Sequence, residues 1–509
     1  MPSMELFCFG IDPLIHLLDR VLQGILIASV PVQGPQLRGQ PRLSNIEQCY
    51  KLIGYADDNK PAITTMEEFH TVDHSLALFE KASGCKLHCD PLTKKCKFLP
   101  LGRWRTTLQQ TDIPCEYMTL SDHLDMVGVT LMASWAKTRK ANGDALQLKV
   151  KNTINPWKAG KFLPITQRGW SLNCYALSKV WFKAKSVDLR VADLKSITSS
   201  CKSWLYQDLL AKPEEMILHR PPHYGGLGLQ HIKYKSLAGF ITTFLQSAAN
   251  PAFQSNLLHT LLYRKHVLGE EDVPGVPAQL PPYFSLELFN TIKTVKNETP
   301  LNIVSMSERD WSRLLTEDYV TMKVHNVGEP REFCPSKPEL LSPATDWVLS
   351  WSMCRQKGLS PDLSSFLWKL LHNLLCSQQR LHRRGVSPSP ICKLCNTEEG
   401  TLQHELIGCH HNANIGQELL TSLKNHIPSL TEESLLRLEF VNLDPDLHLP
   451  VTILTAVTLS YLWKERSTGS RVRAYQVRSE MEQTIAMLRT TRLSSTAEVL
   501  RNMLEPMFL

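Results

Sequence analysis

Four potential metal ligands lie within eighteen residues of one another in the C-terminal third of the sequence: Cys392, Cys395, His404 and Cys409. Two residues separate the first pair of cysteines, and four residues separate the histidine from the last cysteine. Three thiolates and one imidazole are a ligand set of structural, tetrahedral zinc. The spacing therefore predicts a zinc knuckle. The alternative is four unrelated reduced residues, and His410 and His411 could compete as ligands.

A second constraining feature is a pair of adjacent carboxylates, Asp57 and Asp58, between two short apolar runs. The runs, 52–55 and 61–64, predict a β-hairpin with the two aspartates at its tip. Their mutual repulsion is relieved when a divalent cation lies between them, so the pair is a candidate Mg²⁺ site. The alternative is an ordinary acidic turn, because aspartate favours turns in any case.

The window from 137 to 190 is strongly basic, with twelve Lys or Arg against Asp144 and Asp188. Its periodicity predicts two amphipathic helices, at 144–158 and 167–184. A basic face backed by aromatic rings suits contact with phosphates, each of which releases counterions. The alternative is a solvated charged face with the aromatics in the core. The interleaved aromatics are Trp157, Trp170, Tyr175, Trp181 and Phe182.

Composition limits the classes of protein to which the chain can belong. A net charge of +7 permits a polyanionic partner without requiring one. Fourteen cysteines without a signal peptide indicate a reduced, intracellular protein, nuclear or cytoplasmic. No apolar run reaches ~18 residues, so no membrane span is expected. Strands and helices alternate up to about residue 133, which indicates an α+β fold there, and helical periodicity dominates afterwards.

Taken in order, several motifs resemble the second half of the reverse transcriptase of a non-LTR (LINE-type) retrotransposon. Tyr55-Ala56-Asp57-Asp58 is similar to the catalytic hairpin of that family. The four Cys and His residues are similar to its C-terminal zinc knuckle. The other motifs that carry the resemblance lie at 3–14, 83–87, 101–102, 127–129, 155–157, 168–169, 175–181, 225–229, 368–372 and 381–385.

The resemblance implies a fold in four consecutive parts. These are a partial palm (1–133), thumb and post-thumb helices (134–266), a connecting region (267–345) and a C-terminal helical region with the zinc knuckle (346–509). The implied activity is RNA-templated DNA synthesis, and the implied partners are RNA and an RNA/DNA template–primer duplex.

The resemblance also implies roles for individual residues. Asp57 and Asp58 would hold Mg²⁺, and Tyr55 would support the nucleotide or the primer end. Zn²⁺ would be bound at the knuckle. The nucleic acid would be contacted by basic residues at the turn near 94 and on the helices that follow, namely Lys94, Lys95, Lys149, Lys151, Lys158, Lys161 and Arg168.

One departure from the family bears on activity. Polymerases of this kind use a further aspartate on an earlier strand, which would lie upstream of residue 1. Asp12 and Asp19 fall on the helix after that strand and cannot replace it. We therefore expect an N-terminally truncated polymerase with a weak or incomplete Mg²⁺ site, inactive alone. The alternatives are a non-catalytic nucleic-acid-binding remnant and a domesticated interaction scaffold.

Overall fold

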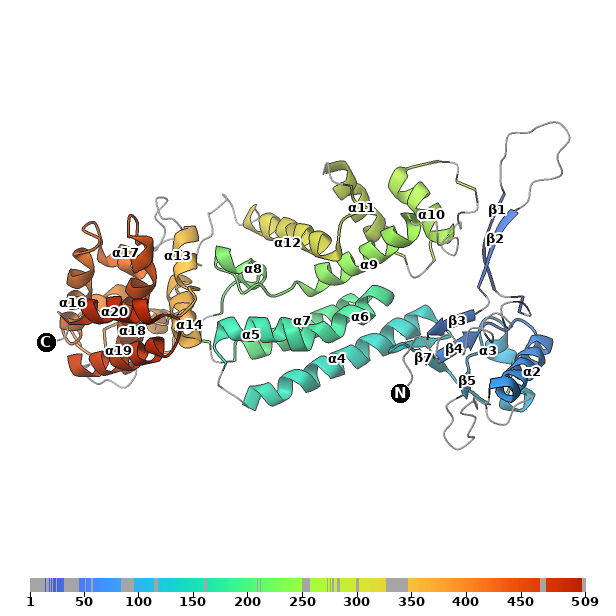
Figure 1. The fold of residues 1–509 in the computed structure, drawn as a ribbon, viewed down its shortest axis with the longest axis horizontal. Helices are drawn as coiled ribbons and strands as arrows, with labels where there is room; N and C mark the ends of the chain where they lie inside the picture. The colour runs from blue at the N-terminus through green and yellow to red at the C-terminus, as the bar shows by residue number, and fades with distance from the viewer. Residues whose placement is uncertain are drawn as a thin grey trace. The chain divides into compact units, whose positions relative to one another are not determined.

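The computed structural model describes the backbone of most of the chain from Ile25 to Glu505 (Figure 1). Before Ile25 it describes five positions: Leu14, Leu18, Arg20, Leu22 and Gln23. From Pro61 onward it also describes side chains, with a few exceptions inside helices. After Ile25 the residues that are not described are 32–44, 51, 56–57, 84–95, 114–117, 160–162, 208, 211, 250–256, 272, 275, 277–278, 282–283, 299–301, 326–346, 467–472 and 506–509.

The described structure is mostly helical and divides into two compact units. The first unit comprises Met1–Val150, Ser178–Ile197 and Ile232–Leu315. The second comprises Lys151–Leu177, Thr198–His231 and Thr316–Leu509. None of the described helices is both long enough and apolar enough to cross a membrane.

The strands of the described residues all belong to the first unit, where they form four two-stranded sheets. Three sheets are antiparallel, and the sheet of β5 and β6 is parallel. The pairs are β1 (Ile25–Pro31) with β2 (Asn45–Tyr50), β3 (Leu52–Tyr55) with β4 (Asp58–Pro61), β5 (Cys96–Phe98) with β6 (Met118–Leu120), and β7 (His123–Met126) with β8 (Val129–Met132).

In two of these pairs, two residues separate the strands. β3 and β4 pair with Tyr55 opposite Asp58, so the strand expected at 52–55 is present. Asp58, however, lies within β4 and not at a tip, and β4 ends at Pro61, where the second run was expected to begin. Residues 56–57 lie outside the described residues. In the β7–β8 hairpin the turn residues Val127 and Gly128 both have positive φ, 47° and 78°. Two consecutive residues of positive φ are typical of a type I′ turn, whose twist matches the flanking strands.

Helix α2 (Met66–Ser83) begins at a capping box. The Thr65 hydroxyl accepts a hydrogen bond from the Glu68 backbone N–H at 3.2 Å. The Glu68 carboxylate accepts hydrogen bonds from the Thr65 N–H at 3.3 Å, from the Thr64 N–H at 2.6 Å and from the Gln23 N–H at 2.5 Å. A single buried carboxylate therefore fixes both the start of α2 and the segment around residue 23.

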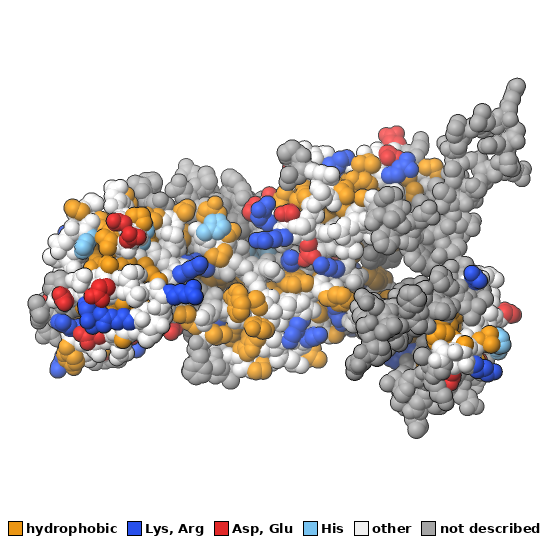
Figure 2. Space-filling view, in the orientation of Figure 1, with side chains coloured by type: hydrophobic (Ala, Val, Ile, Leu, Met, Phe, Trp, Pro, Cys, Tyr) orange, Lys and Arg blue, Asp and Glu red, His pale blue; other side chains and the backbone are white. Residues whose placement is uncertain are grey.

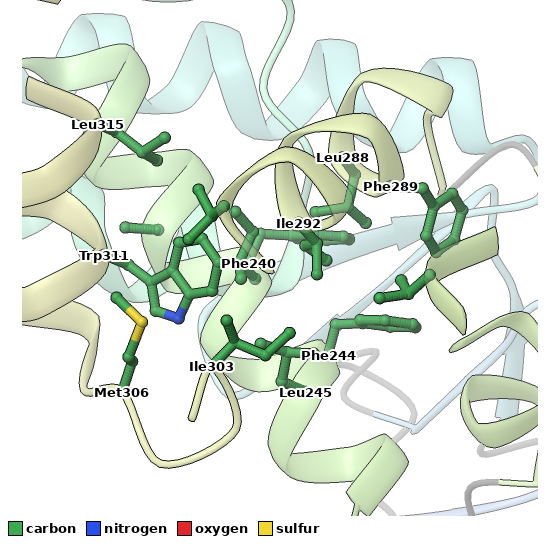
Figure 3. Packing of buried hydrophobic residues seen from close by; sticks show 14 of the residues in the cluster. Phe240, Phe244, Leu245, Leu288, Phe289, Ile292, Ile303, Met306, Trp311 and Leu315 are labelled. Atoms are coloured by element: carbon green, nitrogen blue, oxygen red, sulfur yellow. The ribbon is translucent and has the colours of Figure 1, made fainter. Parts of the chain in front are cut away.

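The main core of the first unit lies among α9 (Ile232–Ala249), α11 (Leu286–Glu298) and the start of α12 (Glu308–His325). Figure 3 shows Phe240, Phe244, Ile292 and Trp311 meeting there. Trp311 is fully buried. The predicted connecting region (267–345) thus contains α11 and α12, which complete the core of the first unit. Smaller elements of this unit are α3 (Trp104–Thr107), η1 (Gln110–Asp112), α6 (Ser178–Ser186), α10 (Leu257–Tyr263) and η5 (Arg264–Leu268).

The basic window forms longer helices than the sequence predicts. Helix α4 runs over Trp135–Ala159 and buries Leu146, Val150 and Ile154 at helical spacing. Pro156 is accommodated three residues before its end. After a break, α5 (Ile165–Ser171), the π-helix η2 (Leu172–Leu177) and α6 follow without interruption, and α7 (Val191–Leu205) comes next.

The second unit is organised around α18 (Pro445–Arg466), whose residues 450–459 are all buried. Helices α14, α16, α19 and α20 pack against it, as Figure 1 shows. Because residues 450–459 are buried all round, this part of α18 has no solvent-exposed face. The other elements of this region are α8 (Glu215–His219), η3 (Pro222–Tyr224), α13 (Trp347–Met353), α14 (Pro361–Leu371), α15 (Gln378–Arg383), η7 (His404–Gly408), α16 (Ala413–Lys424), α17 (Glu432–Leu436), α19 (Ala474–Arg489) and α20 (Ser494–Leu504).

Candidate metal centre

The four predicted zinc ligands are brought together by two short turns. The first turn follows α15, where an isolated bridge pairs Ile391 with Glu399. Within it the Asn396 N–H donates to the Cys392 carbonyl at 2.9 Å, and Asn396 has a φ of 55°. The second turn is the π-helix η7, after which the Cys409 N–H donates to the His404 carbonyl at 2.6 Å. Each turn presents two of the four donor groups to the same point.

The geometry of the donor atoms fits a tetrahedral metal. All four lie within 4.8 Å of one another, and all four residues are buried. The Sγ atoms of Cys392 and Cys409 are 3.9 Å apart, and Cys395 Sγ lies 3.3 Å from His404 Nε2. Tetrahedral zinc with Zn–S bonds of about 2.3 Å separates two sulfurs by roughly 3.8 Å. The cluster is therefore already close to the size that zinc requires.

Burial raises the pKa of the Cys392 and Cys409 thiols, whereas the surroundings of Cys395 and His404 favour metal binding. Burial raises the pKa of the Cys395 thiol, but hydrogen bonds from the Thr397 side chain and from the backbone outweigh it and lower the pKa to about 5. His404 Nδ1 lies 3.0 Å from Glu398 Oε2. That contact fixes the proton on Nδ1 and leaves the Nε2 lone pair directed at the cluster. Sequence spacing alone did not identify Glu398.

A buried ion pair fastens the centre to α18. The Glu405 carboxylate, 1% exposed, is paired with Arg466 and accepts a hydrogen bond from the Gln378 N–H at 2.9 Å. Arg466 also donates to the Cys376 carbonyl at 2.9 Å, and its guanidinium lies over the Trp463 ring. Because Glu405 directly follows the ligand His404, this pair holds the second turn in place.

The predicted Mg²⁺ site lies largely outside the described residues. The structure does not describe Asp57. It also does not describe three of the predicted nucleic-acid contacts, Lys94, Lys95 and Lys161. Tyr55 and Asp58 lie opposite each other in the β3–β4 hairpin, and their side chains are not described. Among the residues that the structure describes, the Cys and His cluster is the one group of three or more potential metal ligands. Mg²⁺ binding therefore stays a prediction.

The remaining predicted nucleic-acid contacts differ in solvent exposure. Lys149, Lys151 and Lys158 are exposed on α4. Arg168 is 3% exposed, and its guanidinium donates to the backbone carbonyls of Leu163 at 2.7 Å and Leu205 at 3.2 Å. Arg168 thus ties α5 to the end of α7 inside the second unit.

Two of these lysines share a groove of about 210 Å³ between the C-terminal half of α4 and α7. Every polar residue that lines it carries a hydrogen-bond donor. The serines of α7 were missed from sequence, although Ser199 and Ser200, with a further serine at 203, are visible there. The lining residues are Lys151, Ile154, Asn155, Lys158, Ser199, Ser200 and Ser203.

Comparison with known proteins bears on the C-terminal region. The family model described as zinc-binding in reverse transcriptase matches residues 338–415, which include all four ligands of the metal centre. No curated protein matches the chain. The sequence match and the donor geometry agree on Zn²⁺ at this centre. Residues 338–415 are therefore similar to a zinc-binding domain found in reverse transcriptases.

Proposed function

We propose that this chain is a nucleic-acid-binding protein derived from a LINE-type reverse transcriptase, with zinc stabilising its C-terminal region. The observation that carries the proposal is the groove between α4 and α7, together with the zinc-binding match. Two exposed lysines supply charge there, and Asn155 and three serines supply neutral donors. Phosphate oxygens accept hydrogen bonds from all of these groups.

The spacing of the lysines supports a backbone ligand. Lys151 and Lys158 lie seven residues apart on one helix, which corresponds to about 10.5 Å along its axis. One nucleic-acid strand advances about 3.4 Å per phosphate, so the two ammonium groups match phosphates about three nucleotides apart. A strand following α4 would pass both lysines and the serines of α7 between them.

The test is the salt dependence of binding to a labelled RNA/DNA duplex, followed by fluorescence anisotropy. Lys151→Ala with Lys158→Ala should lower affinity and reduce the slope of log K against log salt by about 0.9 per lost contact. The matched control is Lys137→Ala with Lys140→Ala, two exposed lysines of the same helix outside the groove. Equal slopes for wild type and the groove variant, or equal effects of both pairs, would contradict the proposal.

A second candidate function, RNA-templated DNA synthesis, is favoured by the β3–β4 hairpin with Tyr55 opposite Asp58. In that case Asp57 and Asp58 would bind Mg²⁺, which stabilises the charge that develops on the transferring phosphate. Primer extension with Mg²⁺ tests it against Asp57→Asn. Incorporation by the wild type and none by the variant would support the candidate. Incorporation by both proteins, or by neither, would rule it out.

A further inference from the structure

Two large aromatic side chains stand exposed at the junction of α5 and η2. Trp170 is 60% exposed and Tyr175 is 55% exposed. Their rings meet edge to face, with centroids 6.1 Å apart and an interplanar angle of 82°. The neighbouring apolar residues Leu172, Ala176 and Leu177 are fully buried, so they already supply the core contact of this segment. Packing therefore does not account for the exposed pair.

The π-helix is what places the two rings side by side. Residues five apart in an α-helix point about 140° away from each other. The i→i+5 hydrogen bonding of η2 widens the turn and brings Trp170 and Tyr175 to one face. Asn173 fixes this segment, because its side-chain amide donates to the Gly228 carbonyl at 2.9 Å and accepts from the Gln230 N–H at 3.0 Å.

Further aromatic contacts extend from the exposed pair inside the second unit. The Tyr175 ring lies 6.3 Å from the Trp157 ring, and Trp157 lies 5.0 Å from the buried Trp204. Lys158, the residue after Trp157, lines the groove between α4 and α7. Trp204 likewise follows Ser203, which lines the groove, so the aromatic contacts and the groove involve the same parts of α4 and α7 in the second unit. Figure 2 shows basic and apolar side chains interspersed over the described helices.

We propose that Trp170 and Tyr175 form a stacking platform for unpaired bases of a single-stranded nucleic acid whose backbone lies in the groove of Lys151 and Lys158. The inference rests on the proposed function and specifies its ligand. Only an unpaired base offers a free face to an aromatic ring, whereas the bases of a duplex are stacked on each other. The positive charge of the groove, whose lysines lie on the same helix as Trp157, favours a nucleic acid over an apolar protein partner.

The experiment compares two labelled probes with the full-length chain, an oligouridine of about 16 nucleotides and an RNA duplex of the same length. Trp170→Ala should raise the Kd for the single strand about 5- to 160-fold. It should leave the Kd for the duplex and the salt slope unchanged, because no phosphate contact is lost. Trp170→Phe should keep most of the affinity, and Phe182→Ala, which removes an exposed aromatic side chain from α6, should have no effect.

Several results of this experiment would contradict the stacking platform. The platform is overturned if Trp170→Ala raises the Kd equally for both probes, or leaves the Kd for the single strand unchanged. It is also overturned if Trp170→Ala and Phe182→Ala change the Kd for the single strand equally. A change in oligomeric state instead would assign the rings to a second copy of the chain and also overturn it. If Trp170→Ala acts as stated while the groove lysine variants do not, the platform stands and the proposed groove is wrong. An unchanged thermal unfolding midpoint for Trp170→Ala excludes misfolding as the cause.

Discussion

Glu398 should strengthen zinc binding without touching the metal. Its carboxylate lies 3.0 Å from His404 Nδ1 and fixes the tautomer that ligates through Nε2. Removing such a partner typically costs 10- to 100-fold in metal affinity. Glu398 is 66% exposed, so water can partly replace it, and we expect Glu398→Ala to be near the lower limit. About tenfold corresponds to about 1.4 kcal/mol of binding free energy.

The assay is competition for zinc between the protein and a chromophoric chelator at neutral pH. The matched control is Glu399→Ala, which removes the same charge from the adjacent exposed position. The backbone carbonyl of residue 398, which accepts from the Cys392 N–H at 2.8 Å, is retained in both variants. If the two variants bind zinc equally well, the Glu398–His404 contact has no role in metal affinity and the reasoning is refuted.

Three further predictions concern stability and are tested by urea unfolding of the zinc-loaded protein. Arg466→Met leaves the Glu405 carboxylate buried without its partner, and should cost about 3–5 kcal/mol. Trp311→Ala opens a cavity in the core of the first unit and should also cost about 3–5 kcal/mol. Burial raises the pKa of Glu68, but its hydrogen bonds, that from the Thr64 side chain first, outweigh burial and lower the pKa from 4.5. Its stabilisation is therefore present above pH 4.5 and is lost as pH falls through the lowered pKa.

Each of these predictions has a result that contradicts it. An Arg466→Met variant as stable as the wild type would mean that Glu405 is solvated or protonated. A loss of less than ~1 kcal/mol for Trp311→Ala would mean that the site collapses around the smaller side chain. For Glu68 the comparison is with Glu68→Gln, which cannot ionise. If the stability of both proteins falls by the same amount below pH 4.5, the carboxylate is not responsible.

Local patterns in the sequence predicted the features whose causes are local. The zinc centre follows from ligand spacing. The strand 52–55 follows from its apolar run, whereas its partner is 58–61 and not the predicted run 61–64. In each case the residues that make the contact lie close together in the chain, so that no tertiary information was needed.

Features that depend on distant contacts were not predictable. The helices α11 and α12 have weak periodicity in sequence, and their buried residues, Trp311 among them, share one core cluster with α9. Arg168 looks like a surface cation in sequence, yet it donates to backbone carbonyls that include that of Leu205. In the π-helix η2, Asn173 forms hydrogen bonds with Gly228 and Gln230, more than fifty residues away in the sequence. The division of the chain into palm, thumb, connecting and C-terminal parts stays a prediction.

X-ray absorption spectroscopy of zinc in the purified full-length chain tests the central claim most directly. We expect one zinc per chain, bound by three sulfurs at about 2.3 Å and one nitrogen at about 2.0 Å. Cys395→Ser should remove one sulfur from that shell. A chain purified with zinc in the buffer that retains none, or a zinc shell of oxygen and nitrogen alone, would contradict the assignment of Cys392, Cys395, His404 and Cys409 as a zinc centre.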